Sequence, residues 1–167
     1  MPRASKPHIV AGMPMYNEEE TIGSVVTRAL RYVDEVICVD DGSSDASARI
    51  AEACGATVIR HRVNRGYGGA LKTLFLRASE LEVDALVLLD SDGQHETRDI
   101  PKLLRPILDG EADFAIGSRF VDGGGGTDMP AYRRLGIKVI TAASNLSSDL
   151  GIKDTQSGFR AFSRTAL

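Results

Sequence analysis

Two aspartates separated by one residue follow an apolar segment and have the chemistry of a metal site. Residues 85–89 (ALVLL) are typical of a buried strand, and the polar residues Asp90, Asp92 and Gln94 follow them. Because an uncompensated buried charge is costly, we expect these carboxylates to be paired or to open onto a site. Mg²⁺ and Mn²⁺ prefer carboxylate and amide oxygens and share their remaining positions with substrate phosphates. A simple turn at Asp92 would explain neither Asp90 nor Gln94, so we favour the metal site.

A second acidic pair, Asp40 and Asp41, follows another apolar segment at 35–39 (EVICV). Ser44 or Asp45 would suffice to cap the helix expected next, so the pair exceeds what a cap needs. A carboxylate at a strand end is well placed to accept a hydrogen bond from a base N–H or a ribose hydroxyl. On these residues alone, a nucleotide site and a simple turn are equally supported.

Three arginines could bind an anion. Arg119 follows the apolar segment 112–116, and Arg133 and Arg134 lie near the start of an expected helix. Cations at a helix start oppose its dipole, which an anionic ligand would compensate, although a solvated basic turn is equally consistent. The glycine run at 123–126 suits a loop that orders over a substrate, or a linker.

The histidines and cysteines indicate no further site. His8, His61 and His95 share no spacing, which favours surface or capping roles over metal ligation. Cys38 and Cys54 lie in apolar contexts without the spacing of a disulfide framework, as is typical of reduced residues in a cytosolic protein.

The elements that must position these residues alternate along the chain. We expect strands at 8–15, 35–39, 57–62, 84–89 and 112–116, the first of them broken by Pro14. We expect helices at 18–33 with Asn17 as N-cap, at a short segment ending near 53, after the glycines of 66–69, at 100–108 and at about 130–150. Strands that are apolar on both faces predict an α/β fold: a three-layer α/β/α sandwich around a mostly parallel sheet. Ligands of such sheets bind beyond the carboxyl ends of the strands, where the acidic pairs and Arg119 fall.

The bulk composition excludes several classes of protein. A chain of 167 residues with 43% hydrophobic and 26% charged residues fits one soluble domain. The net charge of −3 gives no reason to expect nucleic-acid binding. No apolar run approaches the ~18 residues that span a bilayer, and the start (MPRASKPH) lacks the apolar region of a signal peptide. We therefore expect a cytoplasmic chain that could still dock on a membrane surface.

Taken together, the motifs resemble those of the inverting family 2 glycosyltransferases, which have the nucleotide-diphospho-sugar transferase (GT-A) fold. The closest likeness is to the dolichyl-phosphate mannosyltransferases and polyprenyl-phosphate glycosyltransferases. The matching pieces occur in family order over nearly the whole chain: PMYNE, VDDGSSD, NRGYGGA, LLDSDGQH, GSRF, YRR and DTQSGFRAF. Each is weak alone, whereas the ordered series is specific.

The resemblance implies roles for the matched positions. The nucleoside pocket would be lined by Pro14, Tyr16, Glu18, Asp41 and Asp40. Mg²⁺ or Mn²⁺ would be held against the diphosphate by Asp90, Asp92 and Gln94. The donor diphosphate and the acceptor phosphate would face Arg119 and Arg133 or Arg134. The sugar and the acceptor would lie near Asp154, Gln156, Ser157 and Arg160.

The reaction so implied is the inverting transfer of a hexose from a GDP-mannose or UDP-glucose type of donor to a polyprenyl or dolichyl phosphate. A phosphate acceptor is already a nucleophilic anion, with a second pKa near 6, and needs no general base. A saccharide or protein hydroxyl would need one, for which Asp154 is the candidate. We also expect peripheral contact with the cytoplasmic face of a membrane.

The sequence departs from the family in two places. Relatives often carry a serine shortly after the arginine pair, where this chain has LGIKVIT, which makes Lys138 a candidate contact for the acceptor. The chain also ends at Leu167, earlier than relatives that continue into further helices. We expect residues 1–167 to form a single catalytic domain that is truncated at its C-terminal end.

Two other classes share parts of this pattern. A nucleotidyltransferase has a similar sheet and metal carboxylates, but its usual glycine-rich loop after the first strand is absent here. A phospho-receiver module has an acidic pair after its first strand, whereas Asp40 and Asp41 follow the second. Labelling of Asp90 by acetyl phosphate would distinguish the receiver module.

Overall fold

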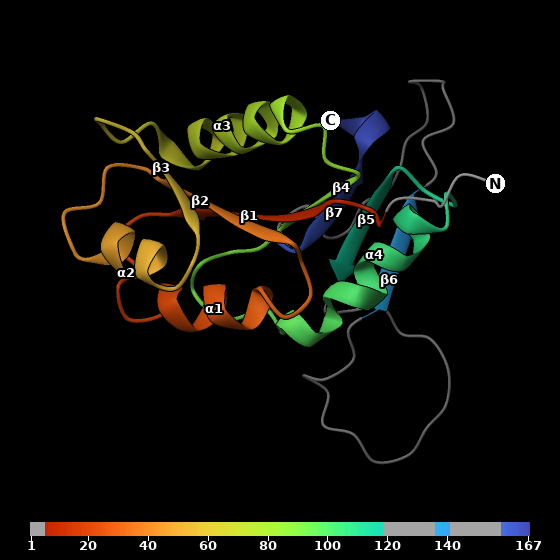
Figure 1. Ribbon diagram of the computed structural model, residues 1–167, viewed down its shortest axis with the longest axis horizontal. Helices are drawn as coiled ribbons and strands as arrows, with labels where there is room; N and C mark the ends of the chain where they lie inside the picture. The colour runs from red at the N-terminus through yellow and green to blue at the C-terminus, as the bar shows by residue number, and fades with distance from the viewer. Residues whose placement is uncertain (1–5, 119–135, 141–157) are drawn as a thin grey trace, which may run out of the picture.

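One mixed β-sheet organises the chain in the computed structural model, which describes residues 6–118, 136–140 and 158–167 (Figure 1). Within those residues the sheet has seven strands in the order β3-β2-β1-β4-β7-β5-β6. The strands are β1 (Ile9–Met15), β2 (Glu35–Asp40), β3 (Thr57–Arg60), β4 (Ala85–Leu88), β5 (Phe114–Ser118), β6 (Gly136–Ile140) and β7 (Arg160–Ser163).

The parallel part of the sheet places the acidic residues at one edge. β1 pairs in parallel with β2 and with β4, and β2 pairs in parallel with β3. Met15 lies opposite Asp40, so β1 and β2 end level with each other. β7 runs antiparallel between β4 and β5, and β6 runs antiparallel along β5. The five strands predicted from the sequence therefore point the same way, and the two antiparallel strands were not predicted.

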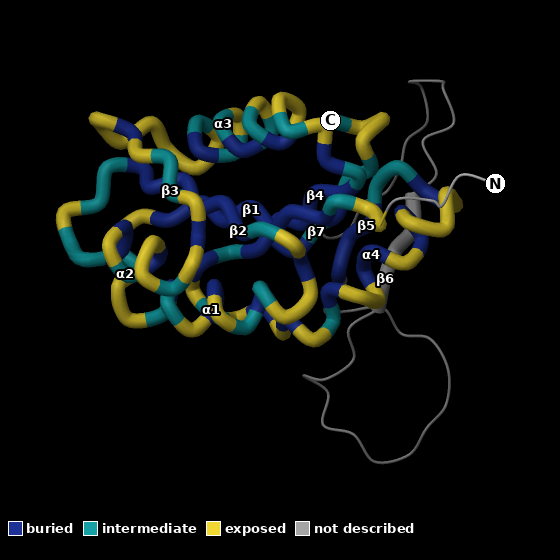
Figure 2. Tube along the Cα trace, viewed as in Figure 1, coloured by how far each residue is buried: buried dark blue, intermediate teal, exposed yellow. Residues whose placement is uncertain are grey.

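Helices cover both faces of the sheet, which confirms the three-layer prediction (Figures 1 and 2). The helices are α1 (Ile22–Ala29), α2 (Ser47–Ala53), α3 (Gly66–Glu80) and α4 (Ile100–Leu108), with 3₁₀ turns η1 (Thr97–Asp99) and η3 (Arg164–Ala166). α1, α2 and α4 pack on one face, and α3 packs on the other.

Alternation along β1 shows why the strands are apolar throughout. Ala11, Met13 and Met15 join the core beneath α1, α2 and α4, while Val10 joins the core beneath α3. All seven residues of β1 are buried. A strand covered on both faces has no polar side, which explains the continuous apolar segments of the sequence.

Several predicted boundaries were wrong. The helix expected over 130–150 is contradicted by β6, whose β-branched residues (GIKVI) favour a strand. α1 begins at Ile22 rather than at residue 18, with Thr21 as its N-cap. Asn17 is not the N-cap and has a left-handed backbone (φ 54°). The N-cap of α2 is Ala46, although Asp45 Oδ1 still accepts the N–H of Ser47 at 2.9 Å. Pro14 does not break the first strand but lies within β1.

The helix expected at 100–108 has those bounds in the structure. Over the described residues, none of the helices has the length and apolar character that crossing a bilayer requires.

We predict that Gly117→Ala lowers the free energy of unfolding by about 1–3 kcal/mol, the usual cost of overpacking a core. A Cβ on Gly117 would overlap the ring of Phe159, which is 1% exposed. The matched control is Gly68→Ala in α3, where no atom lies within 4 Å of the added Cβ. That variant should be neutral or gain up to about 1 kcal/mol. Urea unfolding measures both, and equal midpoints for the two variants would contradict the packing described.

Candidate active site

A cavity of about 280 Å³ opens at the carboxyl edge of the parallel strands. The end of β1 contributes Pro14, Met15 and Tyr16 to its lining, and Asp41 follows β2. Glu18 also lines the cavity. The remaining lining residues are Tyr67 and Ala70, which belong to α3, and Asp90, Ser91 and Asp92, which follow β4. The structure thus brings together six of the residues predicted for the site: Pro14, Tyr16, Glu18, Asp41, Asp90 and Asp92.

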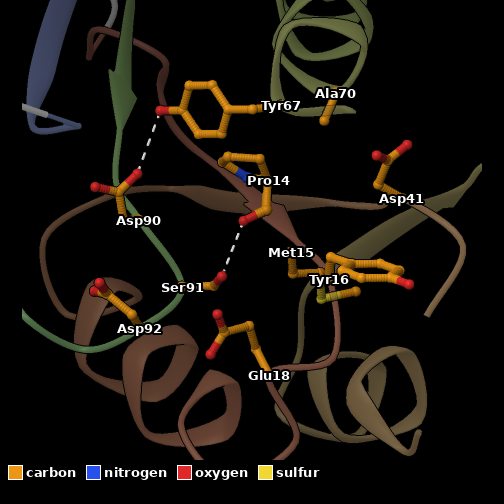
Figure 3. Close-up of a pocket in the computed structure, with 10 residues that line it drawn as sticks. All are labelled: Pro14, Met15, Tyr16, Glu18, Asp41, Tyr67, Ala70, Asp90, Ser91 and Asp92. Carbon is orange, nitrogen blue, oxygen red and sulfur yellow. Dashed lines mark hydrogen bonds between the residues drawn. The ribbon is translucent and has the colours of Figure 1, made fainter. Parts of the chain in front are cut away.

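The cavity has two chemically different ends (Figure 3). Tyr16 and the Asp41 carboxylate lie together on the right of this view, whereas Asp90 and Asp92 lie on the left. The hydroxyl of Tyr67 reaches over toward Asp90, and the Ser91 hydroxyl donates to the Pro14 carbonyl at 2.9 Å. An aromatic ring beside one carboxylate is thus separated from a pair of carboxylates.

Asp41 is buried and held by two donors. Its Oδ1 lies 2.7 Å from His61 Nδ1 and accepts the Arg65 backbone N–H at 2.9 Å. Burial alone would raise the pKa of Asp41, but the His61 hydrogen bond and backbone N–H groups outweigh it and lower the pKa below its ordinary value. Asp41 is therefore an ionised carboxylate, which can only accept hydrogen bonds.

Asp90 is held in the same manner at the other end. Its Oδ2 lies 3.0 Å from His95 Nε2, and its Oδ1 accepts the Tyr67 hydroxyl at 3.3 Å. The His95 hydrogen bond lowers the pKa of Asp90 in spite of its partial burial. Burial and the nearby Asp90 raise the pKa of Tyr67 to about 12, so this hydroxyl stays protonated and can donate.

Gly158 and Phe159, directly before β7, pack close to Asp90 and His95. A Cβ on Gly158 would overlap the Asp90 carboxylate, so this contact requires glycine. The Phe159 ring stacks on His95 with centroids 5.5 Å apart and an interplanar angle of 21°. Residues almost seventy positions apart in the sequence therefore fix one carboxylate.

Asp92 lies in a turn and also lines the cavity. Its Oδ1 accepts the Gln94 backbone N–H at 2.9 Å, and Gly93 between them has a left-handed backbone (φ 76°). Gln94 is exposed and lies outside the lining of the cavity. Asp40 is buried and also lies outside that lining; its Oδ1 accepts the Ser43 N–H at 2.9 Å and closes the turn after β2.

The carboxylates of Asp90 and Asp92 fit a hard divalent cation whose other ligands would come from water and a phosphate-containing substrate. Among the described residues, no group of three or more His, Cys, Asp or Glu side chains is placed to hold a metal ion. Asp90 and Asp92 both line the cavity, and two carboxylates leave positions for water and phosphate oxygens. Mg²⁺ is commonly bound in this way, through one or two carboxylates and the phosphates of a substrate.

The other predicted residues lie largely outside the described part of the chain: Arg119, Arg133, Arg134, Asp154, Gln156 and Ser157. Lys138 lies in β6 opposite Ile116 of β5. Arg160 begins β7 opposite Leu88, the last residue of β4. Arg160 also contributes to the lowered pKa of Asp90.

His61, His95 and Tyr67 were not predicted as site residues. Both histidines are buried, at 8% exposure, rather than on the surface, and each binds a carboxylate that lines the cavity. The signal available was the cost of burying Asp41 and Asp90, which demands a partner but does not name it.

Comparisons with known proteins identify the family. The family model "Glycosyl transferase family 2" matches residues 11–167. A UDP-N-acetylglucosamine–dolichyl-phosphate N-acetylglucosaminyltransferase of Methanococcus voltae is 33% identical over 93% of this chain and 69% of its own length. A dolichol-phosphate mannosyltransferase of Pyrococcus furiosus is 35% identical over 93% of this chain and 46% of its own length.

Solved structures show the same fold. Glucosyl-3-phosphoglycerate synthase of Mycobacterium tuberculosis superposes with a TM-score of 0.67 at 27% identity, over 95% of this chain and 58% of that one. Its complex with Mn²⁺, UDP-glucose and phosphoglyceric acid gives a TM-score of 0.65 at 28% identity, over 95% and 57%. This chain thus spans a little over half of these solved chains. Since the family model covers nearly the whole sequence, the chain belongs to glycosyl transferase family 2, with the α/β fold of the GT-A glycosyltransferases.

Proposed function

We propose that this glycosyltransferase moves a hexose from a nucleoside-diphosphate sugar to a polyprenyl or dolichyl phosphate. The observation that carries the proposal is the division of the cavity into an end with Tyr16 and Asp41 and an end with Asp90 and Asp92. A nucleoside fits the first end and a metal-bound diphosphate the second. The lipid acceptor is supported by the names of relatives such as the Pyrococcus dolichol-phosphate mannosyltransferase.

The charge of Asp41 suits a nucleobase that donates an N–H. Uracil carries a hydrogen on N3 and guanine one on N1, so either base can donate to an acceptor-only carboxylate. Tyr16, at 50% exposure, offers a ring face on which a base can stack. Pro14, Glu18 and Asp40 complete the proposed nucleoside pocket.

Asp90 and Asp92 would hold Mg²⁺ or Mn²⁺ against the diphosphate, with Gln94 as a further proposed ligand. When bound, the cation would offset the negative charge that develops on the departing nucleoside diphosphate. The Tyr67 hydroxyl and His95 fix the Asp90 carboxylate before the donor arrives. The protein residues thus orient the leaving group.

The acceptor chemistry follows from the second pKa of a phosphate monoester, near 6, which makes it an anion at neutral pH. Attack in line on the anomeric carbon needs no general base and inverts its configuration. Arg119 and Arg133 or Arg134 would face the phosphates, while Asp154, Gln156, Ser157 and Arg160 would lie near the sugar and acceptor. Such an acceptor implies peripheral contact with the cytoplasmic face of a membrane.

A second candidate is transfer to a small phosphorylated acid or another hydroxyl acceptor. It is favoured by the likeness to glucosyl-3-phosphoglycerate synthase, which was solved with UDP-glucose and phosphoglyceric acid. A hydroxyl acceptor would need a base to take its proton, and Asp154 is the proposed one.

Nucleotide binding should depend on the metal and on Asp92. We predict that UDP or GDP binds in the presence of Mn²⁺ and that omitting Mn²⁺ abolishes binding. Asp92→Asn should weaken binding about 10- to 100-fold, the range produced even by changes around a metal's ligands. Glu96→Gln, which removes the same charge from an exposed residue outside the cavity lining, should have no effect. Titration calorimetry measures these affinities; metal-independent binding to a folded protein would contradict the proposal.

The acceptor can be identified by product formation. With the nucleotide sugar that binds, we expect transfer to dolichyl phosphate and none to 3-phosphoglycerate. Asp154→Asn should leave kcat within about threefold, because a phosphate anion requires no general base. Transfer to 3-phosphoglycerate, or near-total loss of kcat in Asp154→Asn, would instead support a hydroxyl acceptor.

A further inference from the structure

We infer that His61 is a positioning residue that orients the Asp41 carboxylate for recognition of the nucleobase. This inference rests on the proposed function, in which Asp41 accepts a hydrogen bond from the base. His61 lies directly after β3 and outside the lining of the cavity, so it would act through Asp41 alone.

The hydrogen-bond polarity around Asp41 is fixed by its charge. An ionised carboxylate can only accept, so His61 Nδ1, at 2.7 Å, must carry the proton. The Arg65 backbone N–H donates at 2.9 Å to the same oxygen, Oδ1. With both donors on Oδ1, the carboxylate cannot rotate without breaking two hydrogen bonds, and a ligand in the cavity meets it in one orientation.

Besides its contact with Asp41, His61 is held at two further points. Its backbone N–H donates to the Asp40 carbonyl at 2.8 Å, and its Nε2 lies 2.9 Å from Thr73 Oγ1. Thr73 Oγ1 also lies 3.2 Å from the Gly69 carbonyl, within α3. The imidazole is 5% exposed and so has no alternative partner in solvent.

This arrangement couples two walls of the cavity. Asp41 ends the sheet side, whereas Thr73 belongs to α3, which also supplies Tyr67 and Ala70 to the lining. His61 bridges the two through its ring nitrogens. Buried ion pairs that serve stability alone can often be replaced as a pair by apolar side chains of similar volume, whereas removing one partner is costly. The contact instead holds an ionised acceptor at the cavity surface.

Two substitutions separate the functions of the ring nitrogens. In His61→Asn the amide nitrogen takes the place of Nδ1 and can still donate to Asp41. In His61→Gln it takes the place of Nε2, so it reaches Thr73 but does not donate to Asp41. We expect His61→Gln to weaken UDP or GDP binding about 10- to 100-fold, as for loss of a hydrogen bond to a charged group, and His61→Asn to stay within about threefold of wild type. Both variants should bind pyrophosphate with Mn²⁺ as wild type does, because pyrophosphate has no base.

Each result decides between the two proposals. If the wild-type protein binds neither UDP nor GDP with Mn²⁺, the proposed function fails and this inference falls with it. If wild type binds and His61→Gln binds equally well, the inference alone is overturned. Loss of pyrophosphate binding together with nucleotide binding in His61→Gln would show a structural role and would also overturn it.

A measurement on the wild-type protein covers the case in which the variants do not fold. We expect a proton resonance from the His61 Nδ1–H, protected from exchange by burial, that shifts when the binding nucleotide is added with Mg²⁺. Pyrophosphate with Mg²⁺ should leave it unchanged. A resonance that does not shift when the nucleotide is added, or one that shifts equally with pyrophosphate, would contradict the inference.

Discussion

The carboxylates beyond β2 and β4 carry charge where water is scarce, and much of the surrounding structure keeps them ionised. Asp41 is 4% exposed, and the side chain of Asp90 is 31% exposed. Each is bound by a buried histidine, and each has its pKa lowered from 3.8. A lowered pKa means that these groups stabilise the fold above about pH 4, and that this contribution is lost as the pH falls through the folded-state value. Removing His61 would leave the buried Asp41 charge with one donor fewer, which is costly.

The sheet topology supplies these partners from distant parts of the chain. β3 lies beside β2, so the residue after β3, His61, reaches Asp41. β7 runs between β4 and β5, which brings Gly158 against Asp90 and Phe159 against His95. The antiparallel insertion in an otherwise parallel arrangement therefore completes the metal-binding end of the proposed site.

The sequence predicted those features that depend on local pattern. Continuous apolar segments predicted the parallel strands, and the rule that ligands meet strand ends brought Tyr16, Asp41, Asp90 and Asp92 to one edge. The sequence could not predict His61 and His95 as the partners of Asp41 and Asp90, because this pairing depends on which strands are neighbours in space. β6 and β7 are short, so their periodicity carried little signal and β6 was mistaken for a helix. Asp92 lies in the turn at Gly93 and also lines the cavity, so a turn and a site at this residue do not exclude each other.

In the proposed function, one cavity binds a nucleoside at the Asp41 end and a metal-bound diphosphate at the Asp90 and Asp92 end. A crystal structure with Mn²⁺ and the nucleoside diphosphate that binds, with data collected at the manganese absorption edge, tests it most directly. We predict an anomalous peak for Mn²⁺ about 2.1 Å from a carboxylate oxygen of Asp90 or Asp92. The Mn²⁺ should also be bonded to the diphosphate, and a base N–H should face Asp41. A manganese peak away from both aspartates, or a base at the opposite end of the cavity, would contradict it.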